Sequence, residues 1–113
     1  RKGDRSIEVS LPTSAIEAYK NSTPILVDDI ISTGRTLIEP IKQLKNASLK
    51  APICIGVHAV FADNAYQDLL DAGAEKVITC NSICHLSNQI NLANIIAPAL
   101  KSLIHVFFYK NKN

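Results

Sequence analysis

The part of this 113-residue sequence best suited to chemistry is a pair of adjacent acids followed by a short hydroxyl-rich segment. Asp28 and Asp29 end an apolar run that starts at Pro24, and residues 32–36 (Ser-Thr-Gly-Arg-Thr) come next. Carboxylates accept hydrogen bonds from hydroxyl groups or hold them through Mg²⁺, and free N–H groups at a helix start bind phosphate. The pattern therefore predicts a site for a molecule with hydroxyls at one end and a phosphate at the other, such as a sugar phosphate.

Each residue type in the hydroxyl-rich segment suits the approach of a phosphate. Gly34 lets the backbone come close to a ligand, and Ser32, Thr33 and Thr36 add hydroxyl donors without bulk. Arg35 either contributes only its backbone N–H or adds a cation near the phosphate. The plainer alternatives are a helix N-cap for this segment and a solvent-facing strand end for the two acids. The acids and the segment occurring together favour the binding interpretation.

Alternating strands and helices must hold these residues in place. Hydrophobic periodicity predicts strands at 7–11, 25–28, 52–62 and 76–80, and helices at 34–46, from 63 or 64 to 72, and from 91 onward. A short helical turn is expected within 14–19 and a polar loop at 81–89. Pro40 either kinks its helix or delays the regular part to about Glu39, and Pro98 should kink or split the last helix. Strands alternating with helices imply right-handed crossovers and a parallel sheet, whose carboxyl edge binds the ligand.

The bulk composition describes one ordinary globular domain. Apolar residues make up 47% of the chain and charged residues 19%, and the net charge of +2 is too small to indicate a nucleic-acid or membrane-surface partner. No signal peptide is visible, and polar residues interrupt the apolar stretch 92–108, so it is not a membrane span. Three cysteines beside apolar runs indicate reduced thiols, so we expect a cytoplasmic protein. Because the chain begins with Arg1 and lacks methionine, we expect it to be a piece of something longer.

Three stretches also resemble a known family. The run Val-Asp-Asp-Ile-Ile-Ser-Thr-Gly-Arg-Thr at 27–36 looks like the phosphoribosyl-diphosphate (PRPP) motif of the type I phosphoribosyltransferase fold, in the version of ribose-phosphate pyrophosphokinases. Residues 1–9 resemble the end of that family's catalytic flexible loop and the strand after it, and residues 76–83 resemble its late strand and turn. The resemblance implies an α/β, parallel-sheet, phosphoribosyltransferase-like (Rossmann-like) three-layer domain that is incomplete. The chain would be the C-terminal domain fragment, with the N-terminal ATP-binding domain absent.

The resemblance also implies an activity and roles for individual residues. The family transfers diphosphate from ATP to ribose 5-phosphate to make PRPP. By resemblance, Asp28 and Asp29 bind the ribose 2- and 3-hydroxyls, directly or through Mg²⁺, and residues 32–36 bind the 5-phosphate. Arg1 is either the flexible-loop arginine that stabilises charge on the transferred group or an ordinary solvated arginine. Since no ATP site is visible, this chain alone is expected to bind ribose 5-phosphate weakly without turnover.

Two other functions stay open at the level of sequence. One is a stand-alone phosphoribosyltransferase, which would consume PRPP at the same motif. The other is a non-catalytic PRPP-synthetase-like domain that serves regulation or assembly, which the departures at Arg35, Pro40 and Pro98 leave open. The apolar last helix makes a homo-oligomer the expected state in each case.

Outside the motif, a few polar residues in apolar surroundings deserve an interpretation. His58 lies in an apolar run, where a histidine is more typical of a satisfied structural residue than of a catalyst. Asn81 and Ser82 follow the last predicted strand, from which they could reach the ligand or a subunit neighbour. The two cysteines and the histidine within 80–85 fit a zinc site poorly, because their spacing is irregular and no fourth ligand is near.

Overall fold

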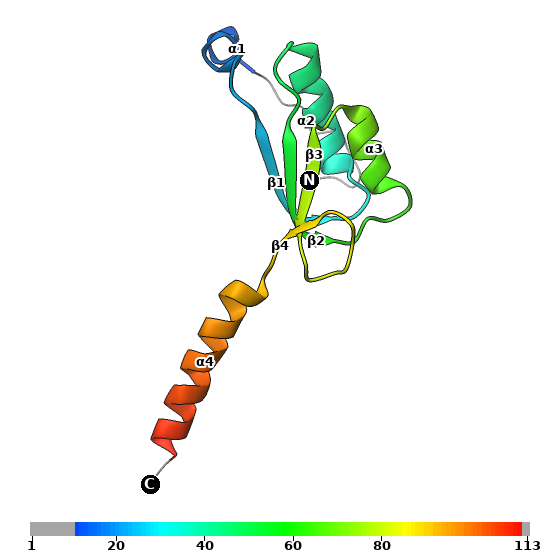
Figure 1. Ribbon diagram of the computed structural model, residues 1–113. Helices are drawn as coiled ribbons and strands as arrows, with labels where there is room; N and C mark the ends of the chain where they lie inside the picture. The colour runs from blue at the N-terminus through cyan, green and yellow to red at the C-terminus, as the bar shows by residue number, and fades with distance from the viewer. Residues whose placement is uncertain (1–10, 112–113) are drawn as a thin grey trace, which may run out of the picture.

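The computed structural model of the protein describes residues 11–111. Its elements, in chain order, are α1 (Thr13–Tyr19), β1 (Ile25–Ile31), α2 (Arg35–Asn46), β2 (Ile53–Ala59), α3 (Ala65–Ala72), β3 (Lys76–Cys80), β4 (Asn88–Ile90) and α4 (Ala93–Lys110) (Figure 1). Arg1 and nearly all of the strand predicted at 7–11 lie outside the described residues. The short helix α1, the helices α2 and α3, and the strand β3 confirm the predictions for those stretches.

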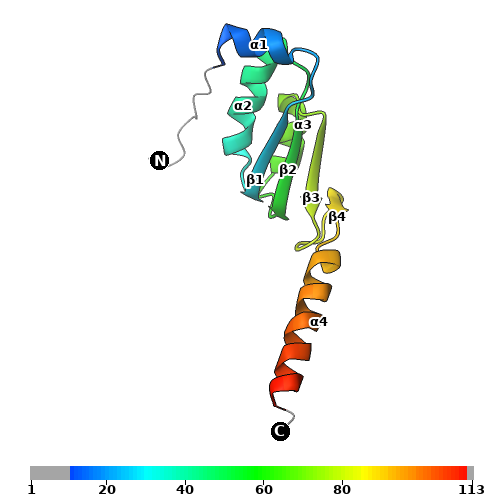
Figure 2. The same ribbon diagram turned by 90° about the vertical axis from the view of Figure 1, so that its left-hand side faces the viewer.

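The four strands form one all-parallel sheet in the order β1-β2-β3-β4. Ile25 of β1 pairs with Ile53 of β2, which in turn pairs with Lys76 of β3. Because the strands neighbour one another in sequence order, right-handed crossovers place α2 and α3 on the same face of the sheet, as Figures 1 and 2 show. The predicted α/β fold with a parallel sheet is therefore confirmed, and the described residues supply two of the three expected layers.

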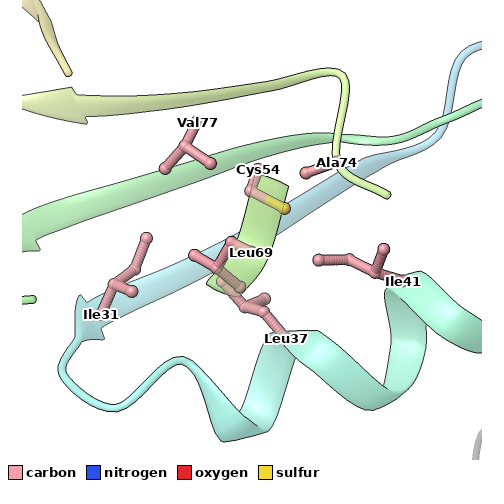
Figure 3. Packing of buried hydrophobic residues seen from close by; sticks show 7 residues of the cluster. All are labelled: Ile31, Leu37, Ile41, Cys54, Leu69, Ala74 and Val77. Atoms are coloured by element: carbon pink, nitrogen blue, oxygen red, sulfur yellow. The ribbon is translucent and has the colours of Figure 1, made fainter. Parts of the chain in front are cut away.

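The hydrophobic core lies between the sheet and these two helices. α2 buries three residues at a spacing of three or four, which places them on one helix face: Leu37, Ile41 and Leu44. The main buried cluster consists of Ile31, Leu37, Ile41, Cys54, Leu69, Ala74 and Val77 (Figure 3). Gly56 makes room for this packing, since a Cβ there would lie 2.5 Å from Ile31 Cδ1. The last residue of β1 is thus anchored in the core immediately before the hydroxyl-rich segment.

The strand β1 is longer than the sequence predicts. Ile30 and Ile31 continue the parallel pairing with His58 and Ala59 of β2, so the strand does not end at Asp28. The side chain of Ile31 is only 1% exposed, and its burial stabilises this extension. Both acids consequently lie inside the carboxyl-terminal part of the strand rather than at its last position.

Both internal prolines lie within continuous helices. α2 contains Pro40 and begins at Arg35 rather than near Glu39, and α4 runs through Pro98 without splitting. A proline removes one backbone hydrogen bond, and in α2 the burial of the apolar stripe offsets that loss. Of the two alternatives predicted for Pro98, the split is therefore wrong, and the kink stays a prediction.

The predicted polar loop 81–89 contains the start of a fourth strand, β4. Asn88 pairs with Thr79, and the Asn88 Nδ2 group donates to Thr79 Oγ1 (2.9 Å) and to the Cys80 carbonyl oxygen (2.8 Å). Only three residues form this strand, too few for an alternating pattern to be visible. Side-chain hydrogen bonds to β3, which a local pattern does not reveal, hold it in place.

The last helix, α4, extends away from the rest of the protein (Figure 1). None of its residues is buried, so the apolar residues of the predicted last helix remain exposed. The described chain consequently has an elongated shape, with principal extents of 65 × 34 × 29 Å. No helix within residues 11–111 combines the length and the apolar character needed to cross a membrane.

Candidate functional site

The two acids are linked directly to the start of α2. Asp28 Oδ1 accepts a hydrogen bond from the Asp29 N–H (3.0 Å), and Asp28 Oδ2 accepts one from the Thr36 hydroxyl (2.8 Å). Asp29 is exposed, and its Oδ1 accepts from the N–H of Ile30 (2.8 Å). Because a hydroxyl has one hydrogen, Thr36 is not available as a hydroxyl donor to a phosphate, contrary to expectation. The bond instead joins the acids and the helix start into one unit.

Gly34 makes the turn from β1 into α2. Its φ of 78° and ψ of −1° lie in the left-handed region, which glycine adopts at little cost. The Gly34 carbonyl accepts hydrogen bonds from the N–H groups of Leu37 and Ile38, both at 3.0 Å, and so begins the helix. The turn is buried against α3, since a Cβ at Gly34 would lie 3.4 Å from the Leu69 side chain.

The segment after β2 holds the same turn from the other side. The N–H of Phe61 donates to the Ile31 carbonyl (2.8 Å), and the N–H of Ala62 donates to the Ser32 carbonyl (2.9 Å). Phe61 has a φ of 44°, an unusual value for a bulky residue, and this turn aims its N–H at β1. These contacts use carbonyl groups of the Ile31–Ser32 backbone and none of the N–H groups that follow.

The N–H groups of the turn are the feature that suits an anion. Within the part of the chain that the structure describes, the backbone N–H groups of Thr33, Gly34 and Thr36 donate to no protein acceptor. The Arg35 N–H lies 3.4 Å from Thr33 Oγ1, near the outer limit for a hydrogen bond. These groups lie at the N-terminus of the 12-residue helix α2, where the helix dipole also favours negative charge. Carboxylates and anion-binding amides therefore lie within one hydrogen-bonded unit.

His58, for which the sequence favours a structural role, lies on the strand next to β1 and contacts Ser82. His58 Nδ1 lies 2.6 Å from Ser82 Oγ, at the carboxyl ends of β2 and β3. The two residues are far apart in the sequence, so no local pattern could have joined them. The shared carboxyl edge of two neighbouring strands is the signal that brings them together.

His85 has a structural environment rather than a metal site. Its ring packs on Phe61 and Tyr66, with centroid distances of 4.4 and 4.9 Å, and its Nδ1 lies 2.7 Å from Ser87 Oγ. Ser87 Oγ in turn lies 2.7 Å from Thr79 Oγ1 in the buried interior. Among the described residues, no three His, Cys, Asp or Glu side chains are grouped so as to hold a metal ion.

Cys54, a member of the hydrophobic core, is unsuited to nucleophilic chemistry. Its side chain is fully buried, and this burial raises the pKa of the thiol from 9.0 to about 11. The thiolate is the reactive form of cysteine, so Cys54 is inert at neutral pH.

A family model described as a phosphoribosyl transferase domain matches residues 1–98. The chain belongs to this family. Among curated relatives, the ribose-phosphate pyrophosphokinase of Sulfurisphaera tokodaii is 34% identical over 76 residues, which cover 67% of this chain and 26% of the relative. That of Methanobrevibacter smithii is 32% identical over 89 residues, covering 79% and 30%. That of Sulfolobus acidocaldarius is 37% identical over 71 residues, covering 63% and 24%.

These findings confirm the family resemblance seen in the PRPP-like motif and explain the parallel sheet. The matched part of the chain includes both acids and the whole turn into α2. The matches span only 24–30% of the length of these relatives. Membership of the phosphoribosyl transferase domain family thus describes the domain, whereas the activity of a whole enzyme is a separate question.

Proposed function

We propose that this chain is the ribose 5-phosphate-binding part of a ribose-phosphate pyrophosphokinase, which transfers diphosphate from ATP to ribose 5-phosphate. The observation that carries the proposal is the Thr36–Asp28 hydrogen bond of 2.8 Å, which joins the Asp28 carboxylate to the turn. Within residues 11–111, the N–H groups of Thr33, Gly34 and Thr36 in this turn donate to no protein acceptor. A sugar phosphate needs both kinds of group at once. The relatives that carry the name ribose-phosphate pyrophosphokinase support the choice among sugar phosphates.

In this proposal each end of the ligand has its own partners. The N–H groups of Thr33, Gly34 and Thr36 bind the 5-phosphate, and Asp28 and Asp29 bind the ribose 2- and 3-hydroxyls. Ser32 and Arg35, both exposed beside the turn, flank the phosphate. Held in this way, the C1 hydroxyl of the sugar faces the β-phosphorus of ATP. Transfers of this kind depend on positioning and on neutralising charge.

Magnesium fits the acids of the site. Asp29 is exposed, and only its Oδ1 is engaged within the described chain, so Oδ2 is available as a ligand. Mg²⁺ prefers oxygen ligands and keeps several waters, so one or two carboxylates together with ribose hydroxyls suffice. When bound, it would supply charge neutralisation during the transfer. The ATP site is proposed to lie in an N-terminal domain outside this chain, and Arg1 to belong to the flexible loop that contacts ATP.

Calorimetric titration with ribose 5-phosphate, in the presence and absence of Mg²⁺, tests the binding. The wild-type chain should bind weakly, and Asp29→Asn should bind more weakly still. Glu75→Gln is the matched control, because it removes one negative charge just before β3, at the opposite edge of the sheet. Equal heats for the wild type and Asp29→Asn would count against the site.

The same preparation distinguishes the alternative functions. Release of pyrophosphate from PRPP would indicate a stand-alone phosphoribosyltransferase, and turnover of ATP with ribose 5-phosphate should be absent from this chain by itself. Failure to bind either sugar phosphate would favour a non-catalytic, regulatory or assembly role. We further propose self-association through apolar surface, because α4 leaves Leu103, Phe107 and Phe108 each more than 60% exposed. Light scattering coupled to gel filtration measures the mass that would support or refute it.

A further inference from the structure

The ring of His58 is held in one orientation by a fixed neighbour. His58 Nδ1 lies 2.6 Å from Ser82 Oγ, which lies 3.4 Å from the Val57 carbonyl oxygen. Ser82 itself lies in the turn after β3, which is tied down because the N–H of Asn81 donates to the Ile90 carbonyl at 3.1 Å. The contact between β2 and the turn after β3 therefore fixes the imidazole rather than leaving it free to rotate.

The strand register places His58 next to the proposed site. Asp28 pairs with Gly56 and Ile30 pairs with His58, so His58 lies one strand away from Asp28 and two residues nearer the carboxyl edge. With strands about 4.8 Å apart and about 3.3 Å per residue, the Cα atoms of Asp28 and His58 are about 8 Å apart. The residues that follow β2 also contact the turn itself, through the Ala62 N–H and the Ser32 carbonyl.

The contact with Ser82 involves only one of the two ring nitrogens of His58. His58 is half-buried, and within residues 11–111 its Nε2 atom has no hydrogen-bond partner. If the Ser82 hydroxyl donates to Nδ1, Nε2 carries the hydrogen of the neutral ring. In that tautomer the ring presents the N–H of Nε2 to an oxygen atom.

The geometry points to His58 as a further ligand-binding residue of the sugar-phosphate site, with Ser82 as the residue that positions it. Nε2 donates a hydrogen bond to a phosphoryl oxygen, since the two acids already serve the hydroxyls and a charged phosphoryl oxygen is a strong acceptor. This inference rests on the proposed binding of ribose 5-phosphate. It adds a side-chain donor from β2 to a cradle otherwise built from backbone amides.

Nitrogen NMR of the histidine rings tests the contact in the 113-residue chain. The chain has three histidines, and His105 on the exposed helix α4 is an internal control. Ribose 5-phosphate should shift the ring nitrogens of His58 and leave those of His105 unchanged, whereas ribose without phosphate should shift neither. A His58 ring that responds to ribose alone would contradict the phosphoryl contact.

The NMR signals of the Thr33, Gly34 and Thr36 backbone amides distinguish a failure of the His58 inference from a failure of the proposed function. If they shift with ribose 5-phosphate while the His58 ring stays silent, the role of His58 is refuted and the proposed function stands. If neither the amides nor the ring respond, the proposed function fails, and this inference fails with it.

Affinity measurements on variants give the magnitude. His58→Ala should weaken ribose 5-phosphate binding roughly tenfold, as expected for one charge-assisted hydrogen bond, and His58→Gln should keep part of the affinity through its N–H donor. Ser82→Ala should weaken binding roughly threefold and alter the His58 ring signals, which Ser82→Thr should restore because it keeps the hydroxyl. His105→Ala should bind like the wild type. A His58→Ala or His58→Gln chain with unchanged circular dichroism and wild-type affinity overturns the inference.

Discussion

Replacing Gly34 with alanine should lower both the stability of the protein and its affinity for ribose 5-phosphate, because both depend on the backbone conformation of this residue. Gly34 has φ 78° and ψ −1°, and an alanine held in this left-handed conformation costs about 1–2 kcal/mol. The space itself can accept a methyl group, because the added Cβ would lie 3.4 Å from Leu69 and 3.8 Å from Ala65 Cβ, both ordinary contacts. Backbone strain alone therefore sets the magnitude. The free energy of unfolding should fall by about 1–2 kcal/mol, and Tm should fall by about 4–8 °C for each kcal/mol lost.

The strained turn can relax only by rotating its peptide groups, which aims their N–H groups away from a bound phosphate. Gly34→Ala should therefore also reduce ribose 5-phosphate affinity, whereas Gly34→Asn should recover part of both losses because asparagine tolerates positive φ. Gly73→Ala is the matched control: φ is 125° at the end of α3, so it should lose stability without losing affinity. Urea denaturation and calorimetry measure the two quantities. Wild-type stability of Gly34→Ala, or an affinity loss equal to that of Gly73→Ala, would refute the reasoning.

Three further predictions concern two thiols and a hydroxyl. At pH 8, iodoacetamide should modify the exposed Cys84 and spare Cys54 until denaturant is added, as mass spectrometry would show. Because burial raises the pKa of Cys54 from 9.0 to about 11, the unfolded chain loses this proton first. The stabilisation that the protonated Cys54 thiol gives the folded state is therefore complete below pH 9 and is lost as the pH rises towards 11. Urea titrations should show the free energy of unfolding fall by up to about 2–3 kcal/mol over this range. Thr36→Val should lower the free energy of unfolding by about 1.5–3 kcal/mol, because it removes the hydrogen bond to Asp28. Thr36→Ser keeps the hydroxyl and should stay near wild type in urea denaturation.

The elements that the sequence predicts best are those with local stop signals. Helix α3 ends at Ala72 because Gly73 adopts a positive φ and its N–H donates to the Leu70 carbonyl, and β3 matches its predicted bounds of 76–80. The end of β1 and the whole of β4 depend instead on pairing with another strand. The Ile31 side chain packs in the core over Gly56 of β2, where a Cβ would lie 2.5 Å from it, and such a partner cannot be recognised from residues near Ile31 in the sequence.

The candidate site shows the same division. The sequence predicts the two acids and the turn that follows, because a motif of adjacent residues specifies them. It does not predict that the Thr36 hydroxyl is already engaged by Asp28, since that bond depends on where β1 ends and how α2 starts. Nor does it reveal the contact of His58 with Ser82, which exists only because β2 and β3 end side by side.

The Thr36–Asp28 bond also determines how the two ends of a ligand would communicate. A phosphate at the turn draws the Thr36 N–H towards itself, and the same residue holds the carboxylate that is proposed to meet the ribose hydroxyls. Moving either end shifts the other through one partly buried bond rather than through a flexible loop. Binding energy from the phosphate can thus be used to orient the sugar ring, which is the contribution that a transfer dominated by positioning requires. A cradle and a carboxylate pair on separate, mobile segments would bind the same groups without that coupling.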